Sequence, residues 1–358
     1  MRSRKEENFM SFFNEKTGAY MRTGIINQGK DTGIDPFMSS FPELLDVGIM
    51  GHCIHGQTGL CIQAGVECYQ NGLYRKEPNM SLEDFRSIVN QCRGETYQIA
   101  LGGCGDPDQH EYFDEILSLC RSAGIVPNFT TSGLGMTKEK ALLCKKYCGA
   151  VAVSWYRNPY TLRAIDMLLD AGVKTNIHYV LNTETLEEAV RHLENNDFPE
   201  RINAVIFLLH KPVGMGTREK VIRYSNRHMD RLLDMVGKAS FNWKIGFDSC
   251  TVPALIYQPG NIDLNSIDTC EGARWSAYIS SDMKMMPCSF DNQRQKWAVD
   301  LRKFSISEAW KSRQFDNFRN RLRDACPGCS RQSICLGGCP ICPEIVLCER
   351  KSSQERNC

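Results

Sequence analysis

Four cysteines near the C-terminal end carry the strongest chemical pattern in this chain of 358 residues. They have the spacing CX2CX5CX3C and are Cys326, Cys329, Cys335 and Cys339. An iron–sulfur cluster needs soft thiolates that converge on a small volume, and a Cys-X-X-Cys turn with a short returning loop can supply them. Gly337 and Gly338 would let the backbone come close to an inorganic cluster.

A structural zinc ribbon is the alternative interpretation of this motif. Zinc takes four thiolates, which would leave six further C-terminal cysteines unexplained: Cys250, Cys270, Cys288, Cys342, Cys348 and Cys358. Ten of the eighteen cysteines therefore lie from residue 250 onward, and three more are close together at Cys53, Cys61 and Cys68. Because core thiols would be scattered, this clustering favours metal binding, and two four-iron clusters account for the count better than one zinc ion.

The rest of the composition is that of an ordinary globular protein. Apolar residues make up 42% and charged residues 24%, which excludes wholesale disorder. A net charge of +1 predicts neither nucleic acid nor an anionic membrane as a partner. No apolar run is long enough to span a membrane, and residues 1–8 lack the apolar run of a secretory signal. We therefore expect a cytoplasmic protein with reduced thiols.

The elements that must position these cysteines alternate between strand and helix from Leu44 to about residue 240. The pattern predicts strands over 44–50, 97–101, 126–131, 150–155, 174–181 and 204–209. Helices are predicted from Ser81, over 110–123, 137–147 and 159–171, from Thr185, and over 217–237. Six such units imply an α/β fold, a partial (β/α)6 TIM-like barrel whose reactive residues lie in the loops after the strands.

The two flanks of the barrel do not follow this alternation. Residues 1–43 are expected to form an extension with at most one short helix or strand. Residues 241–358 are rich in cysteines and turns, with one amphipathic helix that begins at a capping box, Ser305 to Glu308. Three segments are therefore predicted: the extension 1–43, the barrel 44–240 and a small Cys-rich domain 241–358.

The C-terminal motif, preceded by Cys270 and by Met286-Pro287-Cys288 and by a six-unit barrel, resembles the SPASM extension of radical S-adenosylmethionine (SAM) enzymes of the peptide-maturase type. The resemblance covers about residues 44–358 and implies two auxiliary [4Fe–4S] clusters. The inner cluster would be held by Cys250, Cys270, Cys288 and Cys339. The outer cluster would be held by Cys326, Cys329, Cys335 and Cys348, with Cys342 and Cys358 as alternatives to the last. Met283 stands where the family usually has glycine.

The family also carries CX3CX2C and an aromatic residue after its first strand. Here that frame reads Cys61, Gly65, Cys68 and Tyr69, with glycine at the middle position. A [4Fe–4S] cluster that binds SAM needs three protein thiolates, which leave the fourth iron to the nucleotide. We therefore predict that Cys53 completes a stretched CX7CX6C triad, with His52 or His55 as the competing third ligand.

The resemblance also implies SAM contacts at the ends of the next strands. Gly102-Gly103, followed by Asp106, resembles the Gly-Gly-Glu-Pro motif, and Ser132 and Ser154 lie where ribose or carboxylate contacts are typical. Tyr69 is the aromatic residue next to the cluster. Cys104, His178 and His210-Lys211 also lie at strands, and we interpret them as structural.

The function that follows from the resemblance is reductive cleavage of SAM to a 5′-deoxyadenosyl radical, which takes a hydrogen atom from an unactivated carbon. Because SPASM proteins mostly act on peptides, the resemblance implies a maturase of ribosomally made peptides that forms a thioether or carbon–carbon crosslink. It would need a precursor peptide and an electron donor such as flavodoxin or ferredoxin. One alternative is a sulfatase-maturating, formylglycine-forming enzyme, although Ser289 stands where that branch has an acid. A non-catalytic iron–sulfur or zinc scaffold is the other.

Overall fold

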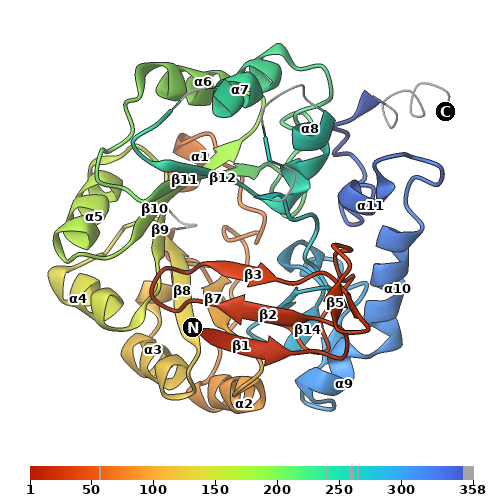
Figure 1. Cartoon of the computed structure of the whole chain (residues 1–358). Helices are drawn as coiled ribbons and strands as arrows, with labels where there is room; N and C mark the ends of the chain where they lie inside the picture. Colours follow the sequence, from red (N-terminus) through yellow and green to blue (C-terminus); the bar gives the residue numbers. More distant parts are fainter. Residues whose placement is uncertain (56–57, 239, 258–261, 264–265, 350–358) are drawn as a thin grey trace.

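The centre of the protein is one sheet of ten strands, in the order β12-β11-β10-β9-β8-β7-β6-β13-β14-β15. The structure, a computed structural model, describes residues 1–55, 58–238, 240–257, 262–263 and 266–349. From β12 to β13 every neighbouring pair is parallel. Helices surround the curved sheet (Figure 1), as right-handed strand–helix crossovers require. The predicted fold class is confirmed.

The six predicted barrel strands lie where the apolar runs place them. They are β6 (Leu44–Met50), β7 (Gln98–Gly103), β8 (Val126–Thr131), β9 (Val151–Ser154), β10 (Thr175–Leu181) and β11 (Ala204–Leu209). Along β6, Leu45, Val47 and Ile49 are buried, whereas Asp46 between them is only partly buried. Alternate residues therefore pack under the helices, and the others face the inside of the barrel.

The predicted helices follow these strands. They are α2 (Leu82–Cys92), α3 (Phe113–Ser122), α4 (Lys138–Tyr147), α5 (Pro159–Asp170), α6 (Leu186–Asn195) and α7 (Arg227–Lys238). Ser81 caps α2 by accepting a hydrogen bond from the Asp84 amide. The last helix is shorter than predicted because Asn226 caps its first turn, accepting hydrogen bonds from the amides of His228 and Met229.

The N-terminal extension is more ordered than predicted. It contains five short strands: β1 (Arg2–Lys5), β2 (Met10–Phe13), β3 (Tyr20–Arg22), β4 (Ile26–Asn27) and β5 (Lys30–Asp31). The β1–β3 sheet contacts the barrel where its strands begin, because Phe13 stacks on Tyr97 and Lys174 donates to the Thr17 carbonyl. Main-chain pairing, which composition does not reveal, makes this segment regular.

The C-terminal region extends the sheet past the boundary predicted near residue 240. Its strands are β12 (Lys244–Phe247), β13 (Ser276–Ile279), β14 (Lys284–Met286) and β15 (Val299–Asp300). The single predicted amphipathic helix is in fact two, α9 (Ile306–Trp310) and α10 (Arg313–Arg323), since Ser312 caps the second and breaks the first. Two short helices, α8 (Val252–Tyr257) and α11 (Gln332–Cys335), flank the cysteines. Within the described residues, no helix has the length and apolar character needed to cross a membrane.

Candidate functional site

The loop that leaves β6 brings two of its cysteines together. Only glycine fits at position 51, because a Cβ at Gly51 would lie 1.9 Å from the Pro78 carbonyl oxygen. At Gly72, a Cβ would lie 3.3 Å from Sγ of Cys68 and 3.7 Å from Sγ of Cys53. The Gly72 amide also donates to Cys68 Sγ at 3.4 Å. A side chain at Gly72 would crowd both thiols, so glycine there lets the backbone pass close to them.

The third predicted ligand, Cys61, lies on the short helix α1 (Leu60–Gln63) of the same loop. Burial and the neighbouring Cys68 thiol raise the pKa of Cys61, with a smaller contribution from Asp106. Cys104 is 3% exposed and donates to the Gln70 carbonyl, and burial with Cys68 and Cys53 raises its pKa to about 12. The three predicted thiols of this loop are therefore neighbours, and the buried Cys104 lies near Cys53 and Cys68.

Asp106 fixes this loop to the ends of two strands. One carboxylate oxygen accepts from His55 Nε2 at 2.8 Å and from the Ser132 hydroxyl, and the other accepts from the Ser132 amide at 3.0 Å. His55, proposed as a competing metal ligand, is therefore turned toward Asp106 through Nε2. The predicted SAM contact of Asp106 stays a prediction, and the structure gives Asp106 and Ser132 a visible role in holding the loop.

The two glycines at the end of β7 have different reasons to be glycine. A Cβ at Gly103, whose φ is +114°, would lie 2.4 Å from the Met50 carbonyl oxygen, so only glycine lets β7 approach β6 there. A Cβ at Gly102 would meet no atom within 4 Å. The backbone at Gly102 therefore borders open space next to the cysteine loop, which is what a bound nucleotide would need.

Tyr156 belongs to the same area, and the sequence analysis did not identify it. Burial raises the pKa of its hydroxyl, with Cys61 and Asp106 adding to the effect, while a hydrogen bond with Ser154 opposes it. The predicted residue Ser154 is thus the neighbour of Tyr156 at the end of β9. The only indication in the sequence was an aromatic residue two positions after a strand, which is too common to be informative alone.

Two side chains tie the turn after α1 to the far side of the barrel. Arg157 donates to the Ala64 carbonyl at 2.6 Å and forms an ion pair with Glu188 on α6. Asn182 donates to the Gly65 carbonyl at 2.9 Å. Gly65, which stands in the place of the usual middle cysteine, has a φ of +75° and so serves as a backbone turn.

The four cysteines predicted for the inner cluster lie together. A hydrogen bond with Cys339, followed by burial, raises the pKa of Cys250. Burial raises the pKa of Cys288, and the thiols of Cys250, Cys270 and Cys339 add to this effect. These four residues come from four separate segments of the chain, so only the folded structure brings them to one place. Cys342 is also close, since its amide donates to Cys339 Sγ at 3.3 Å.

The cysteines predicted for the outer cluster line one cleft. Its wall contains Cys326, Cys329, Cys335, Cys348, Gly337 and Gly338, together with residues of α8 and the C-terminal segment. The Tyr257 hydroxyl lies 3.3 Å from Cys329 Sγ. Cys342 is absent from the residues that line the cleft, and Cys358 lies outside the described residues. This arrangement supports Cys348 as the fourth ligand.

The described cysteines of these clusters are not spaced as the ligands of a single metal ion would be. Among the residues that the structure describes, no three Cys, His, Asp or Glu side chains converge closely enough to hold one metal ion. A [4Fe–4S] cluster is larger than an ion and holds its thiolates farther apart. The donor sets suit such a cluster in their chemistry, because soft thiolates are its usual ligands. Three predicted thiols lie in the loop after β6, and four line the outer cleft.

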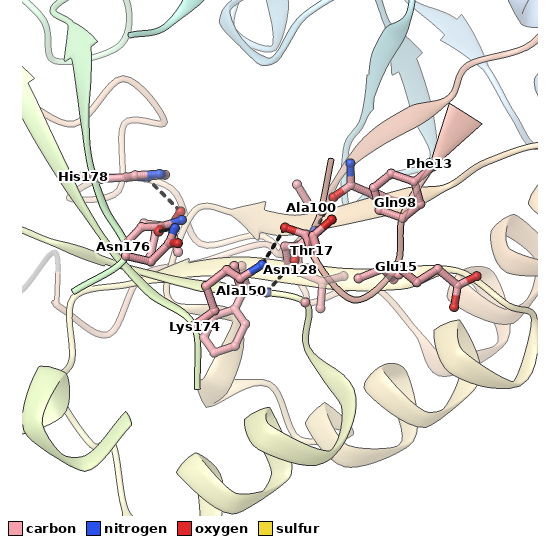
Figure 2. Close-up of a pocket in the computed structure, with 18 residues that line it drawn as sticks. Phe13, Glu15, Thr17, Gln98, Ala100, Asn128, Ala150, Lys174, Asn176 and His178 are labelled. Atoms are coloured by element: carbon pink, nitrogen blue, oxygen red, sulfur yellow. Dashed lines mark hydrogen bonds between the residues drawn. The ribbon is translucent and has the colours of Figure 1, made fainter. Parts of the chain in front are cut away.

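A separate pocket opens at the other end of the barrel (Figure 2). Its wall contains the amides of Gln98, Asn128 and Asn176, which lie near the starts of the strands, together with Thr17 from the N-terminal extension. Asn128 donates to Gln98 Oε1 at 3.0 Å and accepts from the Ala150 amide at 2.8 Å. These bonds hold Asn128 in the wall, and none of the three cysteines of the loop after β6 lines this pocket.

Comparison with known proteins agrees with the thiol pattern. A family model for the SPASM iron–sulfur cluster-binding domain matches residues 270–331. The chain carries a SPASM domain. No curated protein matches the sequence.

Solved structures share the whole fold at low identity. SuiB of Streptococcus suis, bound to S-adenosylmethionine, has 16% identity and a TM-score of 0.64 over 87% of this chain and 77% of SuiB. SuiB has also been solved with its precursor peptide SuiA. The protein anSMEcpe, with bound AdoMet, has 16% identity and a TM-score of 0.59 over 88% of this chain and 91% of its own. These matches confirm the predicted fold, and the family model confirms the SPASM part of the resemblance.

Proposed function

We propose that this protein is a radical SAM enzyme that modifies a peptide. The observation that supports this most directly is the loop after β6, where Cys53 and Cys68 both lie against Gly72 and Cys61 is a neighbour of Cys68. A SPASM domain on the same chain supports the presence of auxiliary clusters. The structural relatives have been solved with SAM, and SuiB with a precursor peptide.

When bound, a reduced [4Fe–4S] cluster with SAM supplies an electron and then a 5′-deoxyadenosyl radical able to abstract a hydrogen atom. The protein's own part is to bind, to orient and to exclude water. Cys53, Cys61 and Cys68 would hold the cluster, and Gly102 would leave room for the nucleotide. The bonds from His55 and Ser132 to Asp106 keep the loop in place over the barrel.

We propose a ribosomally made precursor peptide as the substrate and a thioether or carbon–carbon crosslink as the product. The two groups of C-terminal thiols would hold two auxiliary clusters, and a flavodoxin or ferredoxin would deliver electrons in the cytoplasm. A sulfatase-maturating activity fits less well, because Ser289 follows Cys288. The nearest acid, Asp291, is 0% exposed and accepts hydrogen bonds from the amides of Lys296 and Trp297, which gives it a structural role.

The test is anaerobic purification followed by iron analysis and SAM cleavage. We expect a brown protein with about twelve irons that forms 5′-deoxyadenosine when a strong reductant is added. Replacing Cys53, Cys61 or Cys68 by Ala should each abolish cleavage and remove about four irons. Cys120→Ala, a buried thiol on α3, is the matched control and should retain both.

Full SAM cleavage by Cys53→Ala would disprove the predicted triad. About eight irons without any SAM cleavage in the wild-type protein would favour the non-catalytic scaffold instead.

A further inference from the structure

Lys211 is a buried cation that the proposed reaction does not use. It lies two residues after the end of β11 and is 4% exposed, although a lysine side chain is rarely buried without a partner. It forms an ion pair with Asp248 Oδ2. Its Nζ also lies 4.7 Å from the centroid of the Phe290 ring, a cation–π contact.

Both contacts of Lys211 come from residues next to predicted ligands of the inner cluster. Asp248 stands two residues before Cys250, and Phe290 two residues after Cys288. Asp248 is itself held by the Leu209 amide at 3.0 Å and the Thr251 hydroxyl at 2.9 Å. The ammonium group is therefore fixed between the two segments that carry these thiols.

Lys211 interacts electrostatically with two of the predicted cluster ligands, Cys250 and Cys339. The pKa of Cys250 is raised by its hydrogen bond to Cys339 and by burial, and Lys211 opposes this shift more strongly than Asp248 adds to it. The pKa of Lys211 is raised in turn, with burial opposing the effect of Asp248, Cys250 and Cys339. The Lys211 ammonium group therefore lies within electrostatic range of Cys250 and Cys339.

We propose that Lys211 tunes the inner auxiliary cluster, making it easier to reduce. A fixed positive charge in a buried place stabilises the more negative, reduced state of a cluster, and net charge near the sulfurs is one of the factors that set its potential. The Phe290 ring also packs on Tyr69, with 4.7 Å between ring centroids, directly after Cys68. Lys211 thus lies where the SAM-cluster loop and the inner cluster meet. This inference rests on the proposed function.

The experiment is a reductive titration of the holoenzyme followed by EPR. Added SAM identifies the signal of the SAM-binding cluster, and the other two potentials belong to the auxiliary clusters. In Lys211→Met, we expect one SAM-insensitive cluster to become about tenfold harder to reduce, about 59 mV for one electron. Lys211→Arg, which retains the charge, should restore most of the potential. Asp248→Asn should shift the same cluster in the opposite direction.

Lys244→Met is the matched control, because Lys244 is an exposed lysine at the start of β12, and it should leave all potentials unchanged. Unchanged potentials in both Lys211→Met and Asp248→Asn, or equal shifts in Lys211→Met and Lys211→Arg, would overturn the inference. Failure of the proposed function would be distinct, since the wild-type protein would then lack the signal that changes when SAM is added and would not cleave SAM.

Discussion

At the scale of single residues, the lining of the outer cleft supports the cysteine predicted as its fourth ligand. Cys348 lines the cleft with Cys326, Cys329 and Cys335, whereas Cys342 lies against Cys339. We expect Cys348→Ala to lose about four irons and Cys342→Ala to retain them, measured by iron analysis of anaerobic protein. The reverse result would assign Cys342 to the outer cluster.

The burial of Asp46 predicts how the stability of the folded protein changes with pH. It faces the inside of the barrel on β6, and burial raises its pKa from 3.8 to about 6. The folded protein therefore holds a proton between about pH 4 and pH 6 that the unfolded chain has lost. The resulting stability is present at low pH and disappears as the pH rises through 6.

Replacing Asp46 by Asn should remove this charge penalty. We expect Asp46→Asn to raise the free energy of unfolding at pH 8 on the order of 2 kcal/mol, with the gain vanishing below about pH 4. Urea denaturation at a series of pH values measures it. A gain that is the same at pH 4 and pH 8 would show that ionisation is not its cause.

At the scale of elements, the loop after β6 depends on anchors from the opposite strands. The predicted strand–helix alternation places the loop correctly, and the structure adds the ties from Arg157 and Asn182 to the turn at Ala64 and Gly65. A loop of this length without such ties would pay an ordering cost each time it bound a cofactor.

Arg157→Ala should therefore weaken SAM binding without unfolding the barrel. Loss of one charged hydrogen bond predicts a roughly tenfold higher Kd for SAM, measured by calorimetry on the holoenzyme. Arg163→Ala, which changes an exposed arginine on α5, is the control and should bind normally. An unchanged Kd in Arg157→Ala would mean that the turn holds its place without this anchor.

At the scale of the whole molecule, the N-terminal sheet covers the start of the barrel. Phe13 is fully buried and stacks on Tyr97 with 5.3 Å between ring centroids. Arg4 on β1 forms an ion pair at 3.2 Å with Glu43, the residue before β6, and joins the extension to the barrel by donating to the Glu95 carbonyl. The extension therefore behaves as part of the folded unit.

Phe13→Ala should destabilise the entire barrel by about 3–5 kcal/mol, because it leaves a cavity under the sheet. Chemical denaturation followed by circular dichroism measures the effect. Met21→Ala, at a side chain that is 57% exposed on β3, should cost little. Equal stability of the two variants would mean that the extension only rests on the barrel.

The sequence by itself predicted the barrel and the iron–sulfur motif of the C-terminal region. Apolar runs such as 204–209 predict buried parallel strands because such strands are covered on both faces. The CX2CX5CX3C spacing predicts converging thiols because its ligands are local. The sequence did not predict the strands of the N-terminal extension, the division between α9 and α10, or the place of Tyr156.

Only the tertiary structure decided which distant residues meet. The family resemblance already grouped Cys250, Cys270, Cys288 and Cys339, and the packing of separate segments is what brings them together. No motif indicated the pairing of Lys211 with Asp248, which joins the ends of two neighbouring strands. Local patterns carry no information on such contacts, since each residue in them is common when taken alone. Periodicity and spacing report on nearby residues, whereas the site depends on side chains that approach one another through the sheet.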